Sequence, residues 1–286
     1  MATPHALPVE DIVDTNRYPL AEPGSPGWVR AVSAARQGLR TLGCSVLPDF
    51  VPAERREALH RECASLPRRA YYGEQMVNVY NTAADPSLPE GHPARHTMLR
   101  GNAFVARQDI PAEFIIHRLY TSELFQRFLA DCLGLPRVHP LADPLAGLCL
   151  NIVTPGREHP WHFDTNEFAV SMVTQQPERG GVFEYCPQIR SADAENFAAV
   201  ASVLRGDGAH LIRSLTLRPG DLQLFHGRYS LHRVSTVGGQ TARHSAIFAY
   251  SDRPGVVGKP ERTRQLFGRL APAHDIAAVR SDGLLD

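Results

Sequence analysis

The sequence predicts an α+β protein with a mainly β core and helices around it. Apolar residues recur at helical spacing in residues 28–42 and again in residues 123–133, and the second segment follows a Thr-Ser pair suited to capping a helix. Short segments rich in apolar and alternating residues fill much of residues 145–252. One helical pattern, residues 191–205, interrupts these strands, so we expect a helical insertion in the β core.

The first part of the chain is predicted to support this core. Residues 1–27 are rich in proline and polar groups and predict an irregular N-terminal arm. A helix over residues 28–42, a short strand over 44–51 and a second helix over 53–66 should follow. Because 286 residues can build one large core, we expect residues 28–286 to form a single domain.

Two features between this support and the core bear on function. Residues 71–90 alternate short polar and aromatic pieces and predict a long connection, which is either a lid or a merely solvated loop. A strand is predicted to begin near His96, and it contains Arg100. Arg100 either points into the mouth of the β core, where it would meet a substrate carboxylate, or lies at the surface.

Composition excludes several classes of partner. The chain has 30 basic and 30 acidic residues, so we expect neither a nucleic acid nor an anionic membrane as a partner. No apolar run is long enough for a membrane helix, and the N-terminus lacks a signal-peptide pattern. The five cysteines have no C-x-x-C spacing, which suits a reducing cytoplasm. The oligomeric state stays open.

The candidate metal site begins at His162 and Asp164. Side chains two residues apart on a strand point to the same face, so this imidazole and this carboxylate converge. Together they supply two-thirds of the 2-His-1-carboxylate triad that holds non-haem Fe(II). The alternative is a chance pair on a surface turn, because the chain has 13 histidines and 30 acidic residues.

Two histidines, His226 and His232, compete for the third position. Residues 230–237 and 241–250 predict two strands of a hairpin joined by a tight Gly-Gly turn. In that hairpin His232 lies opposite Ser245, on the face that looks toward the metal. His226 would lie in a loop at a strand end, so His232 is favoured.

Arg243 should share that face with Ser245 and His232. A guanidinium inside a β core is unfavourable unless it meets an anion, and its planar fork suits a carboxylate. The Ser245 hydroxyl can add a hydrogen bond. A salt bridge to a buried Asp or Glu is the structural alternative, but beside a His-x-Asp pair a carboxylate ligand explains Arg243 better.

The ordered set of motifs resembles the Fe(II)/2-oxoglutarate-dependent oxygenases. In chain order the motifs are His162-Phe163-Asp164, Gly180-Gly181-Val182-Phe183-Glu184-Tyr185, Pro219-Gly220-Asp221, Leu231-His232-Arg233-Val234 and Arg243-His244-Ser245. The resemblance covers about residues 145–252 well. Within the family, residues 159–168 look most like the free amino-acid hydroxylases and halogenases.

This resemblance implies a double-stranded β-helix, or jelly roll, with its core at about residues 145–252. It implies Fe(II), 2-oxoglutarate and O2 as cofactor and cosubstrates. Iron would be held by His162, Asp164 and His232. The 2-oxoglutarate would be held by Arg243, Ser245 and Asn151.

The same resemblance implies the reaction and the substrate class. The halogenases replace the ligand carboxylate with Gly or Ala, so Asp164 implies hydroxylation or a related oxidation of an unactivated C–H bond. The expected substrate is a free amino acid or a derivative, and the expected substrate contacts are His159, Arg100 and Thr165. A loop histidine that caps a backbone group is the alternative for His159. A non-oxidative cupin-like metal enzyme or a small-molecule sensor is the rival function, and the inward Arg243 argues against it.

Overall fold

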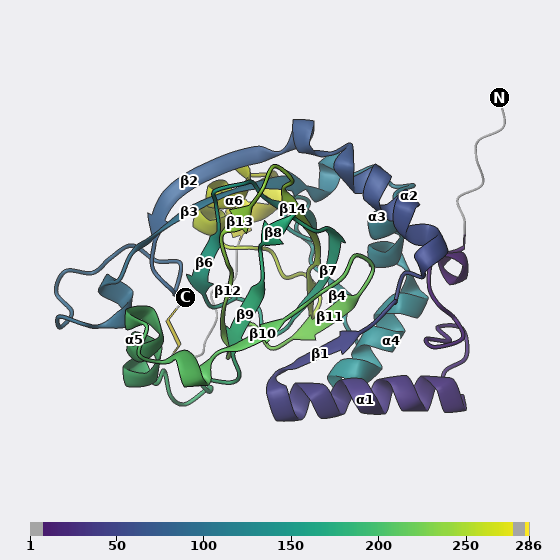
Figure 1. Ribbon diagram of the computed structural model, residues 1–286. Coiled ribbons are helices and arrows are strands. Elements are labelled where there is room, and N and C mark those ends of the chain that lie inside the picture. The colour runs from purple at the N-terminus through teal and green to yellow at the C-terminus, as the bar shows by residue number, and fades with distance from the viewer. Residues whose placement is uncertain (1–7, 277–283, 286) are drawn as a thin grey trace.

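Two antiparallel β-sheets that face each other form the centre of the protein (Figure 1). The computed structural model describes residues 8–276 and 284–285. The larger sheet has seven strands in the order β1-β11-β7-β14-β5-β3-β2, and the smaller has four in the order β10-β9-β12-β6. This order, in which neighbours in space are mostly distant in sequence, is that of a jelly roll.

The predicted motifs lie on short strands or directly beside them. The larger sheet consists of β1 (Cys44–Leu47), β2 (Tyr71–Val77), β3 (Met98–Ala106), β5 (Leu148–Val153), β7 (Ala169–Gln175), β11 (Leu222–Phe225) and β14 (Arg243–Phe248). The smaller sheet consists of β6 (His159–His162), β9 (Phe183–Cys186), β10 (Arg213–Leu215) and β12 (Leu231–Val234). Two further pairs join β8 (Arg179–Gly180) to β13 (Val237–Gly238) and β4 (His139–Pro140) to β15 (Tyr250–Ser251).

Four helices cover the outer face of the larger sheet and build the largest apolar cluster with it (Figure 1). They are α1 (Pro26–Leu42), α2 (Ala53–Ala64), α3 (Ile115–Thr121) and α4 (Glu123–Leu133). The other helices are α5 (Phe197–Arg205) and α6 (Pro260–Phe267), with 3-10 turns η1 (Val9–Asp11), η2 (Pro67–Arg69), η3 (Pro93–Arg95), η4 (Arg107–Asp109), η5 (Ala209–Leu211) and η6 (Pro272–Ile276). None of the helices in the described chain is long and apolar enough to cross a membrane.

Helix ends follow local capping chemistry. The Ser25 hydroxyl accepts a hydrogen bond from the backbone N–H of Trp28, so α1 begins before the predicted start. Ser122 caps α4 in the same way. The insertion helix α5 begins only at Phe197, because residues 191–196 form turns rather than helix. The N-terminal arm is described from residue 8, and its residues 1–7 lie outside the described chain.

Apolar side chains from both sheets fill the space behind the site. Val173, Phe183, Tyr185 and Phe225 are buried between the sheets, and the Phe225 ring lies 4.8 Å from the His232 ring. On the other face of the smaller sheet, buried Phe163 belongs to the apolar cluster that α5 covers. The strand that carries the metal-type residues is therefore packed on both faces, which holds its side chains in place.

Two predictions of local structure are wrong. Residues 71–77 are not part of a connection but form β2, an edge strand that pairs with β3. Most of its residues are partly exposed, which leaves no apolar alternation in the sequence. The predicted hairpin between residues 230–237 and 241–250 is also absent: β12 pairs with β6 and β9, whereas β14 pairs with β5 and β7. Each strand already has two neighbours, so the chain between them crosses from one sheet to the other.

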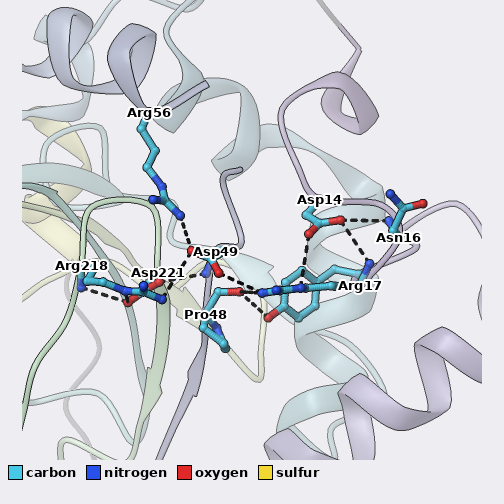
Figure 2. Close-up of polar contacts among 9 residues, drawn as sticks. Asp14, Asn16, Arg17, Pro48, Asp49, Arg56, Arg218 and Asp221 are labelled. Carbon is cyan, nitrogen blue, oxygen red and sulfur yellow. Dashed lines mark hydrogen bonds and ion pairs between the residues drawn. The ribbon is translucent and has the colours of Figure 1, made fainter. Parts of the chain in front are cut away.

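Charged side chains fasten the described part of the arm to the core (Figure 2). The Asp49 carboxylate contacts Arg17 at 2.9 Å, Arg218 at 3.4 Å and also Arg56. Asp221, in the turn before β11, accepts hydrogen bonds from the backbone N–H of Asp49 at 2.8 Å and of Arg218 at 2.9 Å. The Pro-Gly-Asp motif thus joins the end of β1 to the start of β11.

Candidate metal centre

His162, Asp164 and His232 meet at one point between β6 and β12. The two histidines are direct partners across these strands. Nε2 of His162 lies 3.8 Å and Nε2 of His232 lies 3.6 Å from Oδ1 of Asp164. All three candidate ligand atoms lie within 4.8 Å of one another, and no other such group of His, Cys, Asp or Glu occurs among the described residues. One metal ion fits between them.

Hydrogen bonds orient both imidazoles. Nδ1 of His162 lies 2.8 Å from the Pro160 carbonyl, and Nδ1 of His232 lies 2.9 Å from the Ser230 carbonyl. Because Nδ1–H donates to these carbonyls, each Nε2 lone pair faces the common point. Burial, followed by the charges of His159 and His232, lowers the pKa of His162 well below its ordinary value. His162 is therefore neutral, which is the form that binds a metal.

Asp164 was expected on the same strand as His162, but β6 ends at His162 and Asp164 lies just beyond it. Its backbone N–H donates to the Gly227 carbonyl at 3.1 Å. Burial alone would raise the pKa of Asp164, but the neighbouring His232, His162 and Arg262 outweigh it and lower that pKa to about 2. The carboxylate is consequently ionised at neutral pH.

Gly227 makes the space that this carboxylate occupies. A Cβ atom at position 227 would lie 1.8 Å from Asp164 Oδ2, so any side chain there would force the carboxylate or the backbone to shift. No pattern in the sequence predicted this role for Gly227. His226 itself stays outside the group, and its backbone N–H donates to the Gly43 carbonyl at 2.8 Å.

Arg243 is buried on β14, with 6% of its surface exposed. Its Nη1 donates to the Ser245 hydroxyl, and burial lowers its pKa to about 10. No acidic side chain of the described residues pairs with it, so the expected structural alternative, a salt bridge, is wrong. Gly181 has a φ of 60°, and a Cβ there would lie 3.1 Å from Arg243 Cδ, so the Gly-Gly motif leaves room for the arginine.

A row of polar side chains leads from β3 to the metal centre. Asn102 Nδ2 donates to Asn151 Oδ1 at 3.0 Å, and Asn151 Nδ2 lies 3.5 Å from His159 Nδ1. The His159 ring stacks on the His162 ring, with centroids 4.0 Å apart and planes at 12°. His159 therefore lies on β6 and not in a loop. Both amide atoms of Asn151 contact these side chains, so nothing in these contacts supports its expected contact with 2-oxoglutarate.

Unpaired polar atoms accumulate along this row. Arg100 is 1% exposed, so the surface alternative is wrong; Nη2 donates to the Gln265 carbonyl at 3.3 Å, but Nε and Nη1 have no partner. Nε2 of His159 and Oδ1 of Asn102 also lack partners. Burial lowers the pKa of Arg100 to about 10, which leaves it charged at neutral pH. Buried polar groups are normally satisfied, so such a cluster indicates a place for a ligand.

The last two residues to be located are Thr165 and Arg262. The carbonyl of Thr165 accepts a hydrogen bond from Arg228 at 3.0 Å, so its described contact is through the backbone. Arg262 lies on α6 and was not among the site residues expected from the sequence. Burial, followed by the charge of Arg100, lowers the pKa of Arg262 to about 9, although the nearby charge of Asp164 raises it. No sequence pattern links Arg262 to the site, because only folding brings α6 against β2 and β3.

Comparison with known proteins agrees with this geometry. The model of the protein family described as Halogenase D matches residues 29–257. The chain belongs to this family. No curated protein matches the sequence. The predicted membership of the Fe(II)/2-oxoglutarate-dependent oxygenases is thereby confirmed.

Solved structures share the fold of this Halogenase D family member at low sequence identity. A 2OG-Fe(II) oxygenase family protein from Burkholderia pseudomallei is 17% identical, with a TM-score of 0.51, over 78% of this chain and 91% of that one. AviO1 from Streptomyces viridochromogenes is 17% identical, with a TM-score of 0.52, over 78% and 95%. A prolyl hydroxylase from Trichoplax adhaerens, in complex with a peptide fragment, is 13% identical, with a TM-score of 0.50, over 83% and 92%. The predicted jelly roll is confirmed.

The protein is accordingly a 2-oxoglutarate/Fe(II)-dependent oxygenase, whose cofactor and cosubstrates are Fe(II), 2-oxoglutarate and O2. The donors present fit these groups. Two imidazole Nε2 atoms and one carboxylate suit Fe(II), and they leave positions open for further ligands. The buried guanidinium of Arg243, which has no acidic partner among the described residues, suits a carboxylate.

Proposed function

We propose that the protein hydroxylates a free α-amino acid or a close derivative at an unactivated C–H bond. The observation that carries this proposal is the carboxylate of Asp164 beside His162 and His232. The halogenases that the sequence resembles have Gly or Ala at this position, which leaves room for a halide. Here Asp164 fills the position, and Gly227, which has no side chain, leaves room for its carboxylate, which favours oxygen insertion over halogenation.

The metal-site residues are assigned by their orientation. His162 and His232 would hold Fe(II) through Nε2, and Asp164 through its carboxylate. Arg243, with Ser245, would bind the distal carboxylate of 2-oxoglutarate. Once bound, Fe(II) supplies, with 2-oxoglutarate and O2, the oxidising power for the C–H bond. The side chains around it hold the reactants in line and keep the charged groups of the site away from water.

The unpaired atoms beside the metal match an α-amino acid. With the Asn151 N–H facing Nδ1 of His159, the proton of this imidazole sits on Nε2. Arg100 and His159 then offer unpaired donors to a carboxylate, whereas Oδ1 of Asn102 offers an acceptor to an ammonium group. Thr165 completes the proposed contacts. The stacking of His159 on His162 places this binding row next to the metal.

A cytoplasmic location is also part of the proposal. All five cysteines are free and buried, and burial raises the pKa of Cys44 and Cys149 to about 12. These thiols pack as small apolar groups, an arrangement compatible with a reducing compartment.

A screen of free amino acids tests the function. Each amino acid is incubated with the iron-loaded protein, 2-oxoglutarate and air, with chloride present, and products are analysed by mass spectrometry. We expect one amino acid class to gain one oxygen atom together with formation of succinate. A chlorinated product would contradict hydroxylation. Turnover of a substrate without any succinate would favour the cupin-like alternative.

A further inference from the structure

Helix α6 brings a second arginine to the substrate side of the site. Arg262 Nη1 donates to the side-chain Oε1 of Gln265 at 3.2 Å, while Arg100 Nη2 donates to the backbone carbonyl of the same Gln265 at 3.3 Å. One residue of α6 thus holds both guanidinium groups. Arg262 is half-buried, and α6 packs against β2 and β3, so the two arginines lie at the same end of the β core.

These arginines have no acidic ion-pair partner among the described residues. No Asp or Glu of the described chain forms an ion pair with Arg100, Arg243 or Arg262. The acidic group nearest to the row, Asp164, belongs to the proposed metal site. The charge of Asp164 raises the pKa of Arg262, and the charge of Arg262 helps to lower the pKa of Asp164 and of His159.

A count of charges shows how much anion the site can accept. The two positive charges of Fe(II) and the one of Arg243 equal the three negative charges of Asp164 and 2-oxoglutarate. The charges of Arg100, which is buried, and of Arg262, which is half-buried, then remain without a counter-charge. One substrate carboxylate, as the proposed function requires, balances only one of them, and an unbalanced buried charge is unfavourable.

We propose that the substrate is an acidic α-amino acid, whose α-carboxylate binds Arg100 and His159 and whose side-chain carboxylate binds Arg262. This inference rests on the proposed function and names its substrate class. The guanidinium of Arg262 is suited to a carboxylate, and Gln265 orients it. A basic amino acid would place its side-chain cation among three arginines and is disfavoured by charge repulsion.

Anaerobic calorimetry tests the proposal without turnover. The protein is first loaded with Fe(II) and 2-oxoglutarate, and binding of 2-oxoglutarate is recorded as the first step. It is then titrated with L-glutamate and L-aspartate, and in parallel with L-glutamine, L-asparagine, L-leucine and L-lysine. Each acid and its amide have nearly the same shape, so a difference between them reports charge. We expect at least one acid to bind at least about tenfold more tightly than its amide.

Arg262→Gln should remove the preference for the acid over the amide, and Arg262→Lys should restore part of it. The matched control is Arg264→Gln, an exposed arginine on the same helix, which should keep the full preference. Equal binding of acid and amide, tighter binding of lysine, or a preference that survives in Arg262→Gln would overturn the inference while leaving amino-acid hydroxylation standing. If 2-oxoglutarate binds but no amino acid does, the proposed substrate class and this inference both fail.

Discussion

Arginine serves two opposite purposes in this protein. Around Asp49, Arg17 and Arg218 are each 53% exposed at the side chain, and they share one carboxylate with Arg56 (Figure 2). At the metal centre, Arg100 and Arg243 are almost completely buried and have no acidic partner in the described chain.

The arginines around Asp49 have a structural role, whereas the buried arginines at the metal centre indicate ligand binding. The exposed cluster is complete in itself, and solvent screens it, so each pair contributes little to the free energy of folding. Burial of these arginines carries a desolvation cost that no ion pair within the described chain offsets. A bound anion would offset this cost, so the arginines without an acidic partner mark where the site binds anions.

The largest effect should come from the metal ligands. His162→Ala and His232→Ala should each lose the iron that the wild-type protein binds, because two remaining donors do not complete a facial triad. Metal analysis of the purified proteins measures this. His226→Ala is the control and should retain its iron. Full occupancy in both ligand variants would refute the assignment, and loss of iron in the control would move the ligand to His226.

Gly227→Ala should nearly match the loss of a ligand although it removes no donor. The added methyl group would overlap the Asp164 carboxylate and displace it, so we expect iron affinity to fall by about 10–100-fold, as for changes that misplace a ligand. Iron titration, together with a circular dichroism spectrum to verify folding, provides the measurement. If Gly227→Ala binds iron as tightly as His226→Ala, the carboxylate can move without loss of iron binding, which would contradict this prediction.

Arg243→Ala should weaken 2-oxoglutarate binding but not iron binding. Loss of a charge-assisted hydrogen bond, worth about 1.5–3 kcal/mol, should raise the apparent KM for 2-oxoglutarate by about tenfold or more. Succinate formation as a function of 2-oxoglutarate concentration gives the KM. Arg253→Ala, at an exposed arginine, is the control. An unchanged KM in Arg243→Ala would contradict the role.

Arg100→Gln and His159→Ala should uncouple the reaction. Iron and 2-oxoglutarate should still bind, but the substrate would no longer be held beside the metal, so succinate should form without an equal amount of hydroxylated product. The ratio of product to succinate, compared with the surface control His210→Ala, is the readout. Wild-type coupling in both variants would move the substrate anchor elsewhere, in the first instance to residues 78–97.

The smallest effect is expected at the exposed cluster. Asp49→Asn should leave activity unchanged and lower the stability at neutral pH by about 1 kcal/mol or less. Although desolvation would raise it, the pKa of Asp49 is lowered by Arg17, Arg218 and Arg56. Because the pKa is lower in the folded state, the ionised carboxylate stabilises the fold above the unfolded-state pKa of about 3.9. This stability is lost as the pH falls through the folded-state pKa. Thermal unfolding should therefore distinguish the two proteins at pH 7 but not in acid, and a constant difference would contradict this.

Sequence reasoning succeeded where the chemistry is local or ordered along the chain. The spacing of His162 and Asp164, two positions apart, predicted that they meet, and they do so even though β6 ends at His162. His232 was favoured for a wrong reason. It reaches the site by pairing with β6, whereas the argument used a hairpin with β14 that does not exist.

The features that sequence reasoning missed depend on contacts between distant segments. Arg262 reaches the site only because α6 packs against β2 and β3. Gly227 matters only because Asp164 folds against it, and a lone glycine in a sequence does not show which neighbour needs the space. The edge strand β2 was missed because its exposed residues carry no apolar pattern. The periodicity of apolar residues predicts which faces are buried. It therefore says little about partly exposed residues, or about residues whose role depends on a contact with a distant part of the chain.

The close fit of Gly227 and Asp164 also bears on how such enzymes diverge. The codons for aspartate, alanine and glycine differ at the second base alone, so one point mutation at position 164 removes the carboxylate. Because position 227 has no side chain, the volume vacated would stay open between His162 and His232 instead of being filled. A single-nucleotide change in this chain would thus create the open position that a halide requires, because Gly227 adds no side chain there.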